Sequence, residues 1–150
     1  MLSPTLTGWY SQYERMHRTY ARPSNRYVSS IDYDDDLRHF FQDCWHLKDW
    51  IKNDTNVAPA VRDAIEMEVS ALRPLRIAAD LANGCKHIDH SRTNREGAYV
   101  TSISVTISPG RGAESQHTIT LDDGSTLSAQ DVATQAFAAW DAVLRKIGLI

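Results

Sequence analysis

Apolar side chains recur every three or four residues through most of the first 90 positions, the pattern of amphipathic helices. The spacing predicts four helices, over about residues 8–21, 34–53, 59–70 and 74–88. The longest apolar stripe belongs to the second helix and consists of Leu37, Phe40, Cys44, Leu47 and Ile51. Because Phe41 and Trp45 widen that stripe, we expect this helix to lie at the centre of the core.

The pattern changes to alternation after about residue 98. The segment 99–108 is rich in Val, Ile, Thr and Ser, and its apolar residues alternate with small hydroxyl residues, as in a strand with one buried face. Further strands are expected over 116–121 and 125–127, on either side of an Asp123-Gly124 turn. An isolated hairpin is marginally stable in water, so we expect these strands to dock on the helices or to meet a partner.

The last helix is expected over about 129–147, after a Ser128-to-Asp131 sequence that resembles a capping box. The fold class is therefore α+β and mainly α. A length of 150 residues fits a single domain. In that domain a helical bundle (8–90) carries a small antiparallel β-hairpin or meander (98–127), and the C-terminal helix (129–147) closes the structure.

Net charge and the distribution of apolar residues limit the kinds of partner that the protein is expected to bind. The net charge of −3 gives no overall cationic excess for nucleic acid or an anionic membrane, so such binding would need a local patch. No apolar run approaches a membrane span, and the N-terminus lacks the features of a signal peptide, so a cytoplasmic location and no membrane partner are expected. Cys44 and Cys85 lie on apolar stripes and are interpreted as buried free thiols. No cofactor is expected.

The fourth predicted helix carries the most informative polar stripe. If it continues through Gly84, then Arg76, Asp80, Asn83 and His87 share one face. Arginine can bind a phosphate through two hydrogen bonds, and histidine can transfer a proton near neutral pH. Lys86 and Arg92 make the following segment basic, which favours an anionic ligand. The alternative is a solvated face with an Arg76–Asp80 ion pair.

A second polar stripe lies on the second helix, where His39, Asp43, His46 and Trp50 share one face. The first three could ligate a metal, or the histidines could be hydrogen-bonded and pack against a neighbouring element. Lys48 falls within the apolar stripe of the same helix. Because a buried unpaired ammonium is very costly, Lys48 is expected to reach solvent or to pair with a carboxylate, with a catalytic lysine as a further alternative.

Arginines and tyrosines are interleaved near the N-terminus. The residues are Arg15, Arg18, Arg22 and Arg26, among Tyr10, Tyr13, Tyr20 and Tyr27. Such a segment could bind single-stranded RNA through stacking and charge. It could equally form an amphipathic helix that packs on the bundle or on a partner.

The segments Phe40–Asp54 and Ala79–His87 resemble a group of uncharacterised bacterial proteins and, more distantly, the HEPN superfamily of small helical domains. Many HEPN proteins are metal-independent RNases that act as dimers, often in toxin–antitoxin or antiphage systems. Their motif is an arginine, an adjacent polar residue and a histidine shortly afterwards. Asn83 and His87 match the last two, whereas Ala82 occupies the arginine position.

Three hypotheses follow. The first is a HEPN-like domain that binds or cleaves RNA and is expected to be a homodimer. In this hypothesis His87 is the general acid or base and Asn83 orients it. Arg76 or Arg92 holds the phosphate. Lys86 and Asp80 complete that binding site. The second is a non-enzymatic module that binds a protein partner. The third is a metal-dependent hydrolase that uses His39, Asp43 and His46.

Overall fold

In the computed structural model, which describes residues 7–22, 30–84, 96–97, 99–110 and 112–150, the described residues form five helices and three strands. In chain order these are α1 (Trp9–Ala21), α2 (Ser30–Asn53), α3 (Pro59–Ser70), α4 (Arg73–Gly84), β1 (Tyr99–Ser108), β2 (Gly112–Thr120), β3 (Thr126–Ser128) and α5 (Ala129–Lys146). The sheet precedes the C-terminal helix, so the predicted mainly α, α+β class is confirmed.

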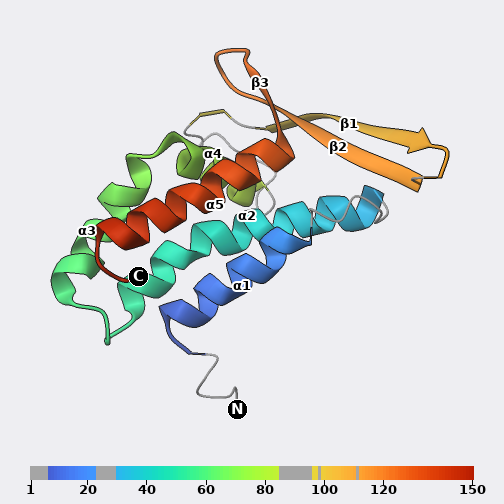
Figure 1. The fold of residues 1–150 in the computed structure, drawn as a ribbon. Helices are drawn as coiled ribbons and strands as arrows, with labels where there is room; N and C mark the ends of the chain where they lie inside the picture. Colours follow the sequence, from blue (N-terminus) through green and yellow to red (C-terminus); the bar gives the residue numbers. More distant parts are fainter. Residues whose placement is uncertain (1–6, 23–29, 85–95, 98, 111) are drawn as a thin grey trace.

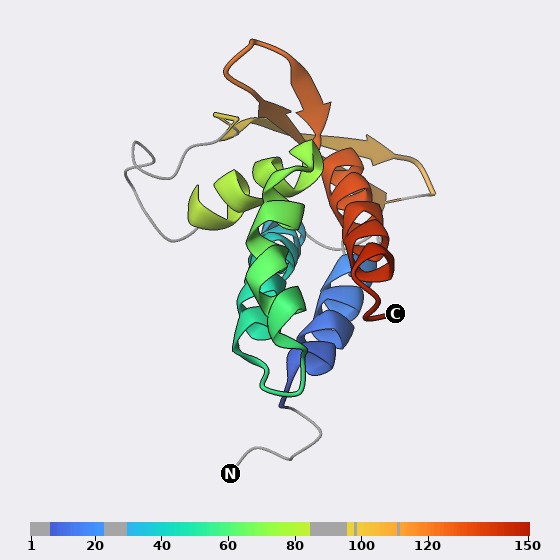
Figure 2. The same cartoon turned by 90° about the vertical axis from the view of Figure 1, so that its left-hand side faces the viewer.

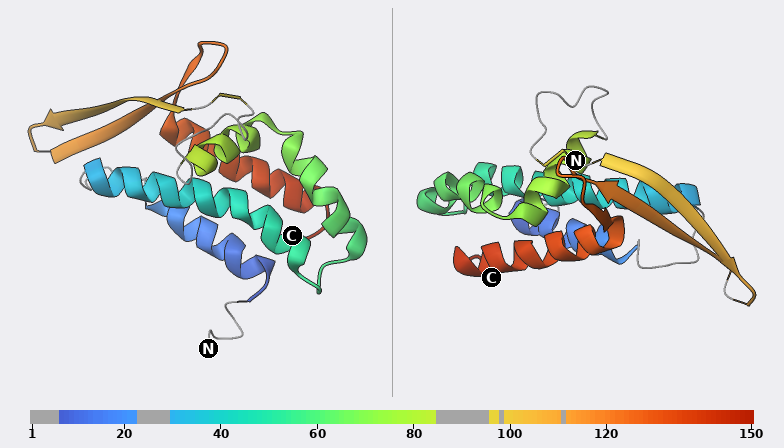
Figure 3. Two further views of the ribbon diagram at one scale, coloured as in Figure 1. Left: turned by 180° about the vertical axis from the view of Figure 1, so that it is seen from behind. Right: turned by 90° about the horizontal axis from the view of Figure 1, so that it is seen from above.

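Helix α2 is the central element, and the other four helices all contact it (Figures 1 and 2). Helix α1 runs beside α2 in the opposite direction, which the view from behind shows clearly (Figure 3). The predicted α2 stripe is buried, with exposed fractions of 0–3% for Leu37, Phe40, Cys44, Leu47 and Ile51. Burying each large apolar side chain contributes about 1.5–3 kcal/mol, which explains why this helix organises the core.

The start of α2 differs from the prediction. The helix begins at Ser30 and not near Asp34, so residues 30–33 are helical where a loop was expected. Tyr33 is buried, and its ring lies 5.0 Å from the ring of His117 in β2. Asp34 binds the His117 Nε2 atom at 3.1 Å, so it joins the helix to the sheet and does not mark the first turn. A tertiary contact therefore sustains an additional helical turn.

The three strands form an antiparallel sheet in the order β1-β2-β3. Ile103 pairs with His117 and Ile119 pairs with Leu127, and an irregularity interrupts β1 between Val100 and Ser102. Strand β2 begins at Gly112, earlier than predicted, and the β1–β2 hairpin projects beyond the helices (Figure 1). All three strands contact the helices, β2 and β3 at α5 and β1 at α4, and in β2 the side chains of His117 and Ile119 are fully buried. Docking of the strands on the helices is thus confirmed.

The junction between β3 and α5 follows the capping prediction. Ser128 is the N-cap of α5, and its hydroxyl accepts a hydrogen bond of 3.0 Å from the Asp131 backbone N–H. This interaction satisfies one of the unpaired N–H groups of the first turn and is worth about 1 kcal/mol. The chain therefore passes from strand to helix without a connecting loop.

Within the residues that the structure describes, no helix combines the length and the apolar character that crossing a bilayer would require.

Candidate functional site

Of the predicted site residues on α4, the structure describes Arg76, Asp80 and Asn83. Asp80 is 2% exposed and accepts a hydrogen bond of 2.7 Å from the Glu96 backbone N–H. Asn83 is half-buried near the described end of the helix. The expectation of a solvated face is therefore wrong for Asp80, because the chain at Glu96 returns to cover this side of α4.

Arg76 does not pair with Asp80. Its Nε atom donates to Glu96 Oε1 at 2.7 Å, and its Nη1 atom donates to the Ser70 carbonyl oxygen at 2.9 Å. The Arg76 hydrogen bond is the main reason why the pKa of Glu96 lies below its usual value, and Arg73 contributes to the same shift. Arg76 thus binds a protein carboxylate where the sequence hypothesis placed a phosphate. The signal that sequence reasoning missed is Glu96, which is separated from α4 by a long segment.

The remaining residues of that hypothesis, His87, Lys86 and Arg92, lie outside the described residues, as does Cys85. The proposed acid or base and its basic neighbours therefore stay predictions. Their grouping with Asn83 in one site stays a prediction as well.

The second predicted stripe lies along the seam between α1 and α2. Asp43 accepts hydrogen bonds from Gln12 Nε2 at 3.2 Å and from Thr19 Oγ1 at 3.2 Å, both on α1. His39 is exposed and His46 is half-buried. Among the described residues, no three His, Cys, Asp or Glu side chains are grouped closely enough to hold a metal ion, and that includes His39, Asp43 and His46. Asp43 therefore joins two helices.

An arginine cleft lies at one end of this seam. We use this name for the cavity of about 390 Å³ lined by Arg15, Arg18, Thr19, Arg22, His39, Gln42 and Asp43. The three arginines follow the i, i+3, i+7 spacing of one helix face. The Arg22 Nη1 atom lies 4.0 Å from Asp36 Oδ1, whereas Arg15 and Arg18 have no carboxylate partner among the described residues. Two exposed guanidinium groups are therefore available to an anion.

The tyrosines of α1 occupy a different face. Tyr13 is buried, its hydroxyl donates to Asp141 at 2.9 Å, and burial is the main cause that raises its pKa to about 12. The ring of Tyr20 stacks on Phe137 of α5 at 4.3 Å. The packing alternative is confirmed for these two rings, so neither forms a stacking platform beside the arginines.

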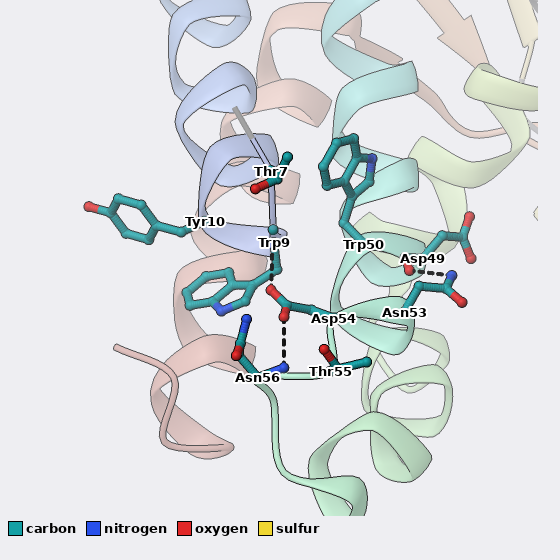
Figure 4. Close-up of a pocket in the computed structure, with 10 residues that line it drawn as sticks. Thr7, Trp9, Tyr10, Asp49, Trp50, Asn53, Asp54, Thr55 and Asn56 are labelled. Carbon is teal, nitrogen blue, oxygen red and sulfur yellow. Dashed lines mark hydrogen bonds between the residues drawn. The ribbon is translucent and has the colours of Figure 1, made fainter. Parts of the chain in front are cut away.

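A second cleft, of about 570 Å³, lies at the other end of the seam, where α1 begins and α2 ends (Figure 4). Trp9 and Trp50 lie on either side of Asp54 (Figure 4). Asp54 accepts hydrogen bonds from the backbone N–H groups of Trp9 at 3.0 Å and Asn56 at 2.9 Å. These two bonds lower the pKa of Asp54, and the bond from Trp9 makes the largest contribution. The Asp54 carboxyl group is therefore ionised at neutral pH.

Of the alternatives for Lys48, the structure shows pairing with carboxylates. Lys48 is 7% exposed, and its Nζ atom lies 2.9 Å from Asp49 Oδ1, 3.3 Å from Glu66 and 4.4 Å from the centre of the Trp45 ring. Burial opposes ionisation of Glu66, but hydrogen bonds from Lys52 and Lys48 outweigh it and lower the pKa of Glu66. The paired lysine therefore joins α2 to α3.

Comparison with known proteins finds no matching family model, no matching curated protein and no matching solved structure. The functional interpretation accordingly depends on the geometry of this chain.

Proposed function

We propose that this protein binds RNA and that phosphate groups of the RNA lie in the arginine cleft between α1 and α2. The observation that carries the proposal is the placement of Arg15 and Arg18 on one face of α1, exposed and without a carboxylate partner among the described residues. Guanidinium groups bind phosphate through paired hydrogen bonds. Arg22 and His39 extend the same lining, which suits a ligand with more than one phosphate.

The charge balance of the whole chain limits this binding to a local surface. The protein carries a net charge of −3, so distant parts of the molecule repel RNA. Asp43 also lines the cleft, but both of its carboxylate oxygens accept hydrogen bonds from α1. We therefore expect modest affinity that decreases steeply as salt increases.

The test is a fluorescence anisotropy titration of a short single-stranded RNA over a range of salt concentrations. In the variant carrying Arg15→Gln and Arg18→Gln, affinity should decrease, and the slope of log affinity against log salt should become shallower by about 1.4 if each arginine contacts one phosphate. The control removes two exposed positive charges outside the cleft, Arg145→Gln and Lys146→Gln on α5, of which Lys146 pairs with Glu68 at 2.6 Å. An equal loss in both variants would show that only overall charge matters, and no binding by the wild type would refute the proposal.

Cleavage of the bound RNA is a separate hypothesis, and it depends on His87 and Asn83. Because Arg76 is bound to Glu96, the phosphate would need another cation, such as Arg92 or Lys86. The experiment is incubation of structured RNAs with the wild type and with His87→Ala in EDTA. Cleavage that is lost in His87→Ala would support a metal-independent RNase. Binding without cleavage by either protein would leave an RNA-binding domain.

The edge of the sheet supports a second candidate function, assembly with another protein chain. Strand β1 contains ten residues and, within the described part of the chain, pairs only with β2. A long edge strand offers backbone N–H and C=O groups to an added strand. A second copy of this chain is the partner that a symmetric edge-to-edge contact would use. Light scattering over a range of protein concentrations tests this, and a monomer throughout would rule out the homodimer.

A further inference from the structure

The cleft at the junction of α1 and α2, hereafter the Trp50 cleft, contains an aromatic side chain that has no polar or ring partner among the described residues. Trp50 is half-exposed, and among the described residues its indole N–H has no hydrogen bond and its ring has no contact with another aromatic ring. Trp140, in contrast, is fully buried and donates its indole N–H to the Cys44 carbonyl oxygen at 2.9 Å. Trp9 packs its ring against Tyr10 and Tyr13, at 5.5 and 6.1 Å. The Trp50 ring is thus available to a ligand.

The charged residues that line the Trp50 cleft, among those that the structure describes, are both acidic, although the positive charge of Arg62 outside the lining also acts on Asp54. Asp49 and Asp54 line it, and neither lysine nor arginine is among the described residues of the lining. Asp49 also binds Lys48 Nζ at 2.9 Å, which offsets part of its charge. Asp54 lies at the centre of the cleft, between Trp9 and Trp50, and is held by the two backbone N–H groups described above (Figure 4). Its position is therefore fixed before any ligand arrives.

These features select a class of ligand. A phosphate-bearing molecule would be repelled by the two carboxylates. A neutral molecule could stack on Trp50 but would gain nothing from the negative charge. An alkylammonium group benefits from both, because a cation is attracted to the face of an indole ring and to a carboxylate. The volume of about 570 Å³ lies within the range of small-molecule sites.

We propose that the Trp50 cleft binds an organic ammonium ion, with the cationic group against the Trp50 ring and beside the Asp54 carboxylate. Asn53 and Asn56 also line the cleft. The Asn53 Nδ2 atom donates to the Asp49 carbonyl oxygen at 2.8 Å, which leaves its amide oxygen and the Asn56 amide for the rest of the ligand (Figure 4). This site is independent of the arginine cleft, because it lies at the opposite end of the seam and has the opposite charge.

The experiment compares choline with 3,3-dimethylbutan-1-ol, a neutral molecule of nearly the same shape, by titration calorimetry of the full chain. We expect choline to bind about tenfold more tightly than the alcohol, the size of effect that cation–π attraction and the carboxylate provide. Titration of a peptide that contains trimethyl-lysine then distinguishes a free ligand from a modified protein tail. In NMR spectra, the indole N–H signal that disappears in Trp50→Leu should shift when choline is added to the wild type.

Variants separate the two contributions. Trp50→Leu should abolish choline binding, and Asp54→Asn should weaken it several-fold while keeping an oxygen that can accept the Trp9 N–H bond. Asp63→Asn removes one exposed charge on α3 outside the cleft and should leave binding unchanged. Circular dichroism verifies that each variant is folded. Equal affinity for choline and the alcohol, or no binding of either choline or the peptide, would overturn the proposal.

Discussion

Trp140 and Cys44 join the last helix to the central one through a buried hydrogen bond, in which the Trp140 indole N–H donates to the Cys44 carbonyl oxygen at 2.9 Å. The Trp140 side chain is fully buried against α2. The two residues are 96 positions apart, so this contact joins segments that are distant in the chain.

The first prediction concerns this contact. Trp140→Ala should lower the free energy of unfolding by about 3–5 kcal/mol, because it leaves a large cavity in the core. Trp140→Phe should cost less, since it removes the indole N–H but keeps an aromatic ring. Chemical denaturation measures both. Trp50→Phe is the control, because Trp50 is half-exposed and should change stability by no more than about 0.5 kcal/mol.

The second prediction compares two glycines with positive φ. Gly97 has φ of +64°, and a Cβ atom there would collide with the Asp122 carboxylate. Gly124 has φ of +81°, but a Cβ atom there would meet open space. Both Ala substitutions introduce backbone strain of about 1 kcal/mol, whereas Gly97→Ala also forces Asp122 to move. Thermal unfolding should therefore show a larger decrease for Gly97→Ala, and equal decreases would contradict the close packing of Gly97.

The third prediction is a dependence on pH at Glu96. The hydrogen bond from Arg76 lowers the pKa of Glu96 in the folded state below its ordinary value of 4.5. The contribution of Glu96 to stability is therefore complete above about pH 4.5 and is lost as the pH decreases through the folded-state pKa. Glu96→Gln should be less stable than the wild type at pH 7, and the difference should shrink below pH 4.5. Melting temperatures measured across this range test it; a difference that is constant with pH would argue against the ion pair.

The fourth prediction concerns Cys44. Its thiol is 1% exposed, and burial raises its pKa to about 12. In a Cys85→Ser variant, the remaining thiol should therefore resist a thiol-specific reagent under native conditions and react quickly in denaturant. The rate of labelling with Ellman's reagent measures this. Fast labelling of the folded protein would show that α2 opens at Cys44 more readily than its burial implies.

Much of the fold could be predicted from the spacing of apolar residues. Helix α3 has the expected bounds, β1 does as well, and the stripe from Leu37 to Ile51 is buried. The start of α2 could not be predicted, because the contact between Tyr33 and His117 that sustains it depends on where the sheet docks. For the candidate site, Arg76 and Asp80 were predicted to share one polar face, with an ion pair between them as the alternative. Both interact with Glu96, a contact that the sequence pattern did not indicate.

The sequence by itself determined the type and order of the helices and strands and which of their faces are apolar, because helix and strand periodicities are local properties of the chain. Tertiary structure alone decided which polar stripes meet. His39, Asp43 and Trp50 share a face of α2 in any helix, but only the antiparallel packing of α1 places arginines at one end of that face and Trp9 at the other. The packing of one helix face on another depends on contacts between segments far apart in the chain, and short-range sequence patterns do not predict such contacts.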